Sequence, residues 1–134
     1  MAKPSPIADP HTKPFWDAAQ ERRLAIQACM RCDTFQHPPG YVCKTCQSRE
    51  LEFRDVQGLG TLYSFTVSEQ SFVPGFEDRL PLAIGLVQLN VKGIVRLLCN
   101  IADEHVGSLE MDMPMRLTFE ELESGTLIPQ FEPA

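Results

Sequence analysis

Two pairs of closely spaced cysteines constrain this 134-residue chain more than any other feature. Cys29 and Cys32 form one Cys-x-x-Cys motif, and Cys43 and Cys46 form a second, with ten residues between the motifs. Each motif allows a tight turn, here called a knuckle, to present two thiolates on one side. Two knuckles complete a tetrahedral shell of four sulfurs, a geometry that zinc accepts because it has no d-electron preference.

The metal predicted at these cysteines is a structural zinc ion. A shell of four protein ligands leaves no position for water, so the metal is expected to build structure and not to catalyse. Two disulfides and a rubredoxin-like iron site are the competing interpretations. A reducing compartment disfavours the disulfides, whereas the spacing permits iron. The surrounding segment, residues 25–54, has almost no core, so removal of the metal is expected to unfold it.

The N-terminal sequence indicates the compartment. Residues 1–6 contain no apolar signal segment, and no later stretch approaches the roughly 20 apolar residues of a membrane span. We therefore expect a cytoplasmic protein that does not contact a membrane, and its composition is that of an ordinary globular domain.

The rest of the chain predicts a mainly β protein in three parts. Residues 1–24 form a loose arm (1–12) and a helix from Lys13 to Leu24, where Pro14 suits the first turn. Residues 25–54 form the zinc ribbon. Residues 55–134 contain five or six short strands with little helix between them, which favours a small closed barrel of the OB-fold type.

Alternation of side chains assigns the faces of the predicted strands. Val95, Leu97, Cys99 and Ile101 form one apolar face, so the fifth cysteine is interpreted as an inert core thiol. Thr61, Tyr63, Phe65 and Val67 form another face that we assign to the core.

Large apolar side chains outside the strands are candidates for contact with a partner or ligand. Phe15 and Trp16 lie on a helix too short to be stable alone. Phe72 and Phe76 lie on a loop, residues 70–81, that is long for a hairpin connection. Packing of these side chains within their own protein is the alternative interpretation.

No catalytic motif is recognisable. The sequence lacks a Gly-x-Ser-x-Gly elbow and a His-Glu-x-x-His helix, and its histidines (His11, His37 and His105) lie in segments predicted as loops. Nothing assembles a nucleophile, a base and an oxyanion hole, so we do not expect the chain to be an enzyme by itself.

A single-stranded nucleic-acid-binding protein is the principal alternative function, since many such proteins combine a zinc ribbon with an OB-fold. Binding of this kind draws its affinity from Lys and Arg side chains that neutralise phosphates. Residues 1–54 hold eight Lys or Arg against six Asp or Glu, whereas residues 55–134 hold four against twelve. A barrel with a balance of −8 would repel a polyanion, so we expect no nucleic-acid partner.

From Phe15 onward the chain resembles the acyl-CoA-associated family, formerly a domain of unknown function, in which a rubredoxin-like zinc ribbon precedes an OB-fold. The resemblance rests on Phe15-Trp16, the two knuckles with Pro38-Pro39 between them, and further segments in a matching order. These further segments are Gly58 to Val67, Pro74-Gly75-Phe76, Leu80-Pro81, Met113-Pro114, and Pro129 with Phe131. Family members usually have glycine at the position of Asp112, and often at those of Asp33 and Gln47.

The resemblance implies a role as a non-catalytic accessory subunit in a hetero-oligomer. Relatives bind thiolase-superfamily enzymes, including lipid-transfer-protein-like thiolases, aldolases and acyltransferases, or hotdog-fold enoyl-CoA hydratases. Degradation of steroid side chains is one such setting. The small subunit is expected to stabilise its partner and to help shape a site for acyl-CoA. Because the ribbon half is the more basic, Arg22 and Arg23 are the candidates for contact with the phosphates of coenzyme A (CoA).

Overall fold

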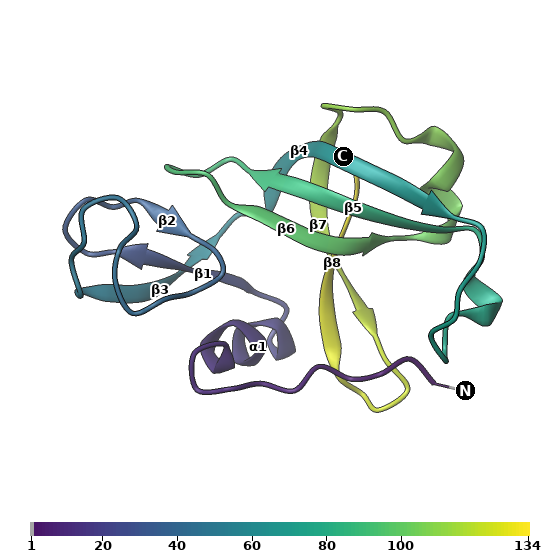
Figure 1. The fold of residues 1–134 in the computed structure, drawn as a ribbon, viewed down its shortest axis with the longest axis horizontal. Helices are drawn as coiled ribbons and strands as arrows, with labels where there is room; N and C mark the ends of the chain where they lie inside the picture. The colour runs from purple at the N-terminus through teal and green to yellow at the C-terminus, as the bar shows by residue number, and fades with distance from the viewer. Residues whose placement is uncertain (1) are drawn as a thin grey trace.

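The computed structural model describes residues 2–134 and shows a small sheet on one side of a β-barrel, with a helix below and between them (Figure 1). The ribbon sheet has the strand order β2-β1-β3, and the barrel is closed in the order β4-β5-β6-β8-β7. In chain order the elements are α1 (Lys13–Gln20), β1 (Leu24–Cys29), β2 (Phe35–Gln36), β3 (Leu51–Val56), β4 (Leu59–Ser68), the 3-10 helix η1 (Glu77–Arg79), β5 (Leu82–Leu89), β6 (Arg96–Ile101), the 3-10 helix η2 (Asp103–Ser108), β7 (Pro114–Glu121) and β8 (Leu127–Pro133). The predicted mainly β fold, with an N-terminal helix, a ribbon and an OB-type barrel, is confirmed.

Helix α1 ends several residues earlier than predicted, and Leu24 already belongs to β1. Arg22 adopts a left-handed backbone with φ of 57°, and its amide donates a 3.0 Å hydrogen bond to the Ala19 carbonyl. The Arg23 amide donates a 2.9 Å bond to the Ala18 carbonyl. These two bonds form a Schellman motif, which satisfies the last carbonyls of the helix and turns the chain into the sheet.

Strand β1 is buried along its whole length because β2 and β3 flank it and α1 packs against it. Its one polar side chain, Gln27, accepts 2.7 Å and 2.8 Å bonds from Gln36 Nε2 and the Gly40 amide. Gln36 Oε1 in turn accepts a 2.9 Å bond from the Lys44 amide. This buried pair of glutamines therefore fastens the long loop between the knuckles to the sheet.

The N-terminal arm is not loose as predicted. Lys3 Nζ lies 2.7 Å from Glu120 Oε1, and both side chains are largely buried. Ser5 Oγ lies 2.9 Å from Ser124 Oγ in the turn between β7 and β8. The loose arm was predicted wrongly because its partners lie more than a hundred residues away in the chain. No local sequence pattern indicates such contacts.

A β-bulge in β4 corrects the predicted assignment of its faces. The register shifts between Leu62 and Ser64, so Tyr63 is the extra residue. A bulge of this kind moves the alternation by one position. Leu62 is fully buried before it and Phe65 packs against the core after it, while Tyr63, predicted to be a core residue, is 43% exposed.

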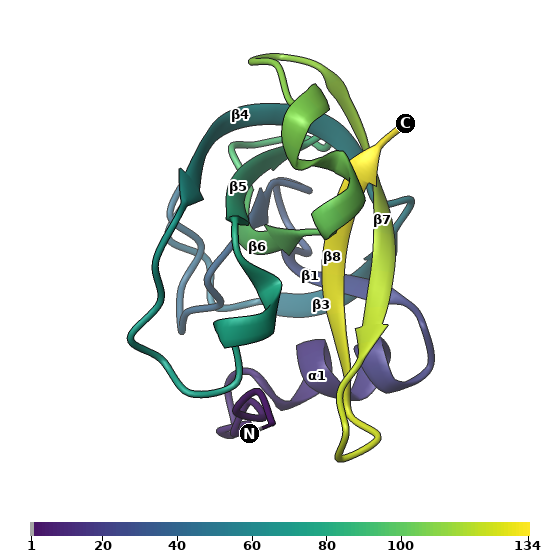
Figure 2. The same cartoon turned by 90° about the vertical axis from the view of Figure 1, so that its right-hand side faces the viewer.

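Every barrel strand contributes to the core: Leu62 from β4, Val87 from β5, Ile101 from β6, Met115 from β7 and Phe131 from β8. Cys99 of β6 belongs to this core as predicted. The seam between β6 and β8 is short, because among the described residues their one backbone pair joins Ile101 and Phe131. Helix α1 and the arm lie beside this seam (Figure 2). The helix thus covers a place where the barrel wall is incomplete.

Candidate functional site

The four knuckle cysteines come together at the end of the ribbon sheet that carries the C-terminus of β1. Their sulfurs all lie within 4.8 Å of one another. The Sγ atoms of Cys29 and Cys46 are 3.6 Å apart, as are those of Cys32 and Cys43. A disulfide would need about 2.05 Å. Four sulfurs bound to one zinc at about 2.3 Å in a tetrahedron would be about 3.8 Å apart. The observed spacing therefore fits a metal centre and excludes disulfides between these pairs.

The backbone of each knuckle stabilises its cysteine sulfurs through amide hydrogen bonds and a left-handed turn. The Arg31 amide donates to Cys29 Sγ at 3.4 Å, and the Thr45 amide donates to Cys43 Sγ at 3.3 Å. Asp33 and Gln47, which follow the second cysteine of each knuckle, have φ of 59° and 62°. This left-handed conformation is the one that glycine adopts most readily, and both turns form here with Asp33 and Gln47 in its place.

Hydrogen bonding favours the thiolate form of the first knuckle. A backbone hydrogen bond from Cys32 lowers the pKa of Cys29, and the Thr34 hydroxyl lowers the pKa of Cys32 to about 6. A backbone hydrogen bond from Ser48 lowers the pKa of Cys46, but burial and the neighbouring sulfurs outweigh it and raise that pKa to about 11. Four thiolates therefore gather here only when a cation offsets their mutual repulsion.

A second cluster of possible ligands, Glu104, His105 and Glu132, lies beside η2. His105 Nε2 is 3.3 Å from Glu104 and 3.7 Å from Glu132, while Glu132 also accepts a 2.9 Å hydrogen bond from Arg116. These contacts account for the cluster as surface ion pairing.

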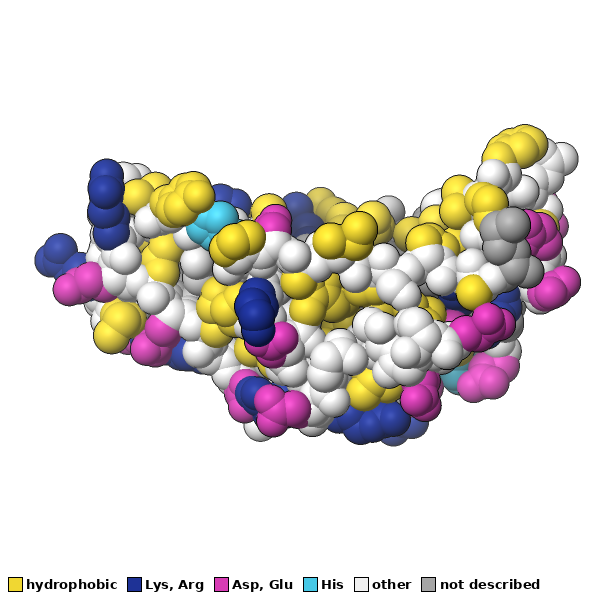
Figure 3. Space-filling model, turned by 90° about the horizontal axis from the view of Figure 1, so that it is seen from below, with side chains coloured by type: hydrophobic (Ala, Val, Ile, Leu, Met, Phe, Trp, Pro, Cys, Tyr) yellow, Lys and Arg dark blue, Asp and Glu magenta, His cyan; other side chains and the backbone are white. Residues whose placement is uncertain are grey.

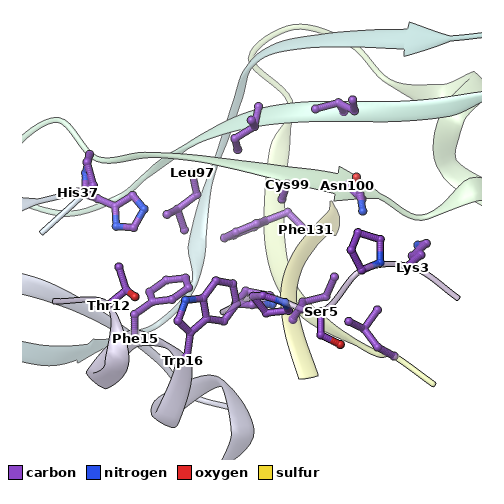
Figure 4. A pocket seen from close by; sticks show the side chains of 18 of the residues that line it. Lys3, Ser5, Thr12, Phe15, Trp16, His37, Leu97, Cys99, Asn100 and Phe131 are labelled. Carbon is purple, nitrogen blue, oxygen red and sulfur yellow. The ribbon is translucent and has the colours of Figure 1, made fainter. Parts of the chain in front are cut away.

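A cavity of about 630 Å³ lies between the arm, α1 and the barrel. Hydrophobic side chains are visible along the middle of the face that contains it (Figure 3). Phe15 and Trp16 rise from α1 toward Leu97 on β6 and Phe131 on β8, and the arm closes one side with Lys3 and Ser5 (Figure 4).

The aromatic side chains singled out in the sequence fall into two groups. Phe15 is buried, and with Trp16 and Phe76 it lines the cavity. The Phe76 ring also lies 5.2 Å from Lys3 Nζ. Phe72, by contrast, stands in solvent with 93% of its surface exposed. Packing within the protein therefore accounts for Phe15, Trp16 and Phe76, whereas Phe72 remains an exposed surface residue.

The two arginines predicted to meet CoA also differ from each other. Arg23 is held by Glu21 at 3.0 Å and by Asp55 at 2.5 Å. Arg22 is exposed, and its left-handed backbone ends α1. A substitution of Arg22 therefore alters a helix terminus as well as a charge.

Sequence reasoning missed most of the cavity wall. Leu97 and Cys99 were assigned to the barrel core, and Lys3 to Pro6 were assigned to a loose arm. All of them line the cavity. The signal was absent from the sequence, because the wall assembles from segments far apart in the chain.

Comparison with known families agrees with this architecture. A model of the "ChsH2, rubredoxin-like zinc ribbon domain" matches residues 16–52, and a model of the "ChsH2, C-terminal OB-fold domain" matches residues 53–120. The chain belongs to the ChsH2 family. The cysteine centre is therefore the zinc centre of a rubredoxin-like ribbon.

Two solved structures are similar to this ChsH2-family chain. A chain of the "Ltp2-ChsH2(DUF35) aldolase" is 32% identical, with a TM-score of 0.83 over 96% of this chain and 98% of that chain. A DUF35-family protein from Sulfolobus solfataricus, 15% identical with a TM-score of 0.63, covering 95% of this chain and 87% of that chain, shows the same fold.

Two curated relatives are named as subunits of enzymes. A "Probable enoyl-CoA hydratase alpha subunit" of Thermomonospora curvata is 36% identical over 90% of this chain, and a "3-oxo-4,17-pregnadiene-20-carboxyl-CoA hydratase alpha subunit" of Mycobacterium tuberculosis is 31% identical over 89%. The chain spans 37% and 36% of the length of these two relatives. Within its described residues, it has no helix of the length and apolarity that a membrane crossing requires.

Proposed function

We propose that this chain is a non-catalytic accessory subunit of an enzyme complex that acts on acyl-CoA thioesters, with a structural zinc ion in its ribbon. The observation that carries the proposal is the near full-length match to a chain from a solved aldolase complex. The names of both curated relatives, as alpha subunits of hydratases for CoA thioesters, support the same class.

The partner that we propose is a thiolase-superfamily enzyme of the aldolase type, and the substrate class is the CoA ester of a steroid side chain. A hotdog-fold hydratase is the second candidate partner, since the curated relatives are named as hydratase subunits. In either complex the partner would carry out the chemistry, while this chain would stabilise it and help shape the CoA site.

The charge of the barrel supports this proposal over nucleic-acid binding. Each of its four basic side chains has a partner within the molecule: Lys92 donates to the Cys32 carbonyl, Arg96 lies 3.8 Å from the Tyr63 ring centroid, Arg116 pairs with Glu132, and Arg79 lies 3.5 Å from Glu120. Cations that are engaged in this way are poorly placed to neutralise a phosphate backbone.

Co-expression with the enzymes encoded beside this chain tests the proposal. A thiolase-like or hydratase-like protein should co-purify at a fixed ratio, and activity on an acyl-CoA should require both proteins. Turnover by this chain alone, or no complex with any neighbouring enzyme, would contradict the accessory role.

Phe72 is the residue that we propose for contact with the partner, because almost its whole surface is exposed. Phe72→Ser should weaken the complex, whereas Met111→Ser, at an exposed apolar residue away from the 70–81 loop, should not. Equal affinity of the two variants for the partner would remove Phe72 from the interface.

Arg22 is the better placed of the two arginines for the phosphates of CoA, since Arg23 is engaged by two carboxylates. Arg22→Gly removes the guanidinium while suiting the left-handed backbone, so the helix end is preserved. We expect Arg22→Gly to weaken binding of CoA to the complex more than Arg23→Ala does. Unchanged binding in both variants would exclude the two residues.

A further inference from the structure

The cavity beside the β6–β8 seam is built from parts of the chain that lie far apart in the sequence. Its walls come from the arm, α1, the His37–Pro39 segment of the ribbon, and the barrel strands. Among the described residues, one backbone pair joins the seam, Ile101 with Phe131. The volume of about 630 Å³ is in the range of pockets that enclose a small organic molecule.

The chemistry of the wall is apolar. Phe15, Trp16, Leu97, Ile128 and Phe131 supply rings and aliphatic groups from three elements. The polar lining residues, Ser5, Thr12, His37 and Asn100 together with Lys3, are a minority. Water needs about two to four polar partners, so most of this wall offers a poor site for it.

The ionisable groups at the wall do not favour a charged ligand. Lys3, the lining ammonium group, is already bound by Glu120 at 2.7 Å. Burial lowers the pKa of His37, so its imidazole is neutral at pH 7. A ligand carboxylate or phosphate would therefore lose its hydration without gaining an available cation.

We propose that this cavity binds the uncharged hydrocarbon part of a small molecule, such as a long acyl chain or a fused-ring system. The inference is independent of the proposed function, because it rests on the shape and chemistry of the cavity wall alone. It adds a ligand site on this chain to the zinc centre and to any surface for a partner.

Trp16 provides a direct reporter, because it is the single tryptophan of the chain and it lines the cavity. The full zinc-loaded chain is titrated with the neutral fluorophore N-phenyl-1-naphthylamine, while Trp16 is excited and energy transfer to the probe is followed. We expect saturable transfer with one probe per chain. Transfer that rises linearly without saturation would overturn the proposal.

Two pairs of variants localise the probe. Ile84 and Leu86 are both half-buried on the outer face of β5, and the first lines the cavity while the second does not. Ile84→Phe should weaken binding by about tenfold or more, since it occupies part of the space, and Leu86→Phe should leave binding unchanged.

The second pair changes exposed residues, so folding is not at risk. Leu98 lines the cavity and is 75% exposed, while Ile94, at 69%, does not line it. Leu98→Glu should weaken binding of the probe and Ile94→Glu should not, with thermal unfolding and zinc content as checks on folding. Equal binding by both members of each pair would place the probe elsewhere and overturn the proposal.

Competition separates the possible sources of the hydrocarbon. A long-chain fatty alcohol, a neutral ketosteroid, the CoA thioester of the matching fatty acid, and CoA alone are each titrated against the bound probe. Displacement by the alcohol or the ketosteroid supports a free lipid as the source. Displacement by the thioester well ahead of the alcohol supports an acyl group carried on CoA. Displacement by CoA alone, or by none of the four, would contradict the assignment.

Discussion

The backbone amide of Phe35 in the zinc ribbon donates a 2.8 Å hydrogen bond to the carbonyl of Lys92 at the tip of the β5–β6 hairpin. The Lys92 side chain makes a second hydrogen bond to the ribbon, because its Nζ lies 2.6 Å from the Cys32 carbonyl in the first knuckle. The β5–β6 hairpin of the barrel is therefore hydrogen-bonded to the ribbon next to the metal centre, through the backbone and the side chain of Lys92.

Gly93 makes this junction possible, and its replacement should weaken it. The residue has φ of 108°, and a Cβ at this position would come within 2.7 Å of both Phe35 O and Thr34 Cγ2. We expect Gly93→Ala to lower the free energy of unfolding by about 1–3 kcal/mol. Gly107→Ala is the matched control, because a Cβ there meets nothing within 4 Å. Equal stability of the two variants in chemical denaturation would show that the close approach is not required.

The left-handed residue after the second knuckle offers a stabilising change. Gln47 has φ of 62°, a conformation that a side chain opposes and glycine accepts. We expect Gln47→Gly to raise the free energy of unfolding by about 0.5–1 kcal/mol, and Gln47→Val to lower it, since a β-branched side chain suits this conformation least. Denaturation of the zinc-loaded variants measures both effects, and a destabilised Gln47→Gly variant would contradict the explanation.

Loss of one zinc ligand should unfold the ribbon and spare the barrel. Cys43→Ser removes one thiolate of four, and the ribbon has too small a core to fold without the metal. We expect zinc content to fall from about one ion per chain. Amide protons of β1 and β3 should exchange rapidly with solvent, while those of β5 remain protected.

Cys99→Ala is the matched control for the zinc centre, because burial raises the pKa of the Cys99 thiol to about 12 and keeps it outside the metal centre. This variant should retain its zinc and the protection of the ribbon. Loss of zinc from Cys99→Ala, or a protected ribbon in Cys43→Ser, would argue against the assigned roles.

The buried ion pair of the arm should contribute more than an exposed one. Lys3→Ala leaves Glu120 buried with a weaker set of partners, so we expect a loss of about 1–2 kcal/mol and faster proteolysis of the arm. Lys13→Ala breaks a pair with Asp17 that is largely exposed on both sides, and it should change stability by no more than about 0.5 kcal/mol. Similar proteolysis of the two variants would show that the arm is not fastened at Lys3.

The sequence by itself determined those features that depend on neighbours in the chain. The two Cys-x-x-Cys motifs predict the knuckles, because short turns position their four sulfurs. The alternation of apolar and other side chains from Val95 to Ile101 predicts a strand with one buried face, because the pleat has a period of two. Where one inserted residue changed that period, at the bulge of Tyr63, the same reasoning assigned the wrong face.

Tertiary structure alone decided the arm, the junction and the cavity. Lys3 pairs with Glu120, Phe35 bonds to Lys92, and Trp16 lines the same cavity as Phe131 of the β6–β8 seam. The partners in each case are far apart in the sequence, so no periodic pattern predicts them. Such contacts depend on how completed elements pack in space, and that packing is set by the shapes of whole surfaces. The metal centre could therefore be predicted from its ligands, whereas the cavity between the arm, α1 and the barrel became visible only once these elements were in place.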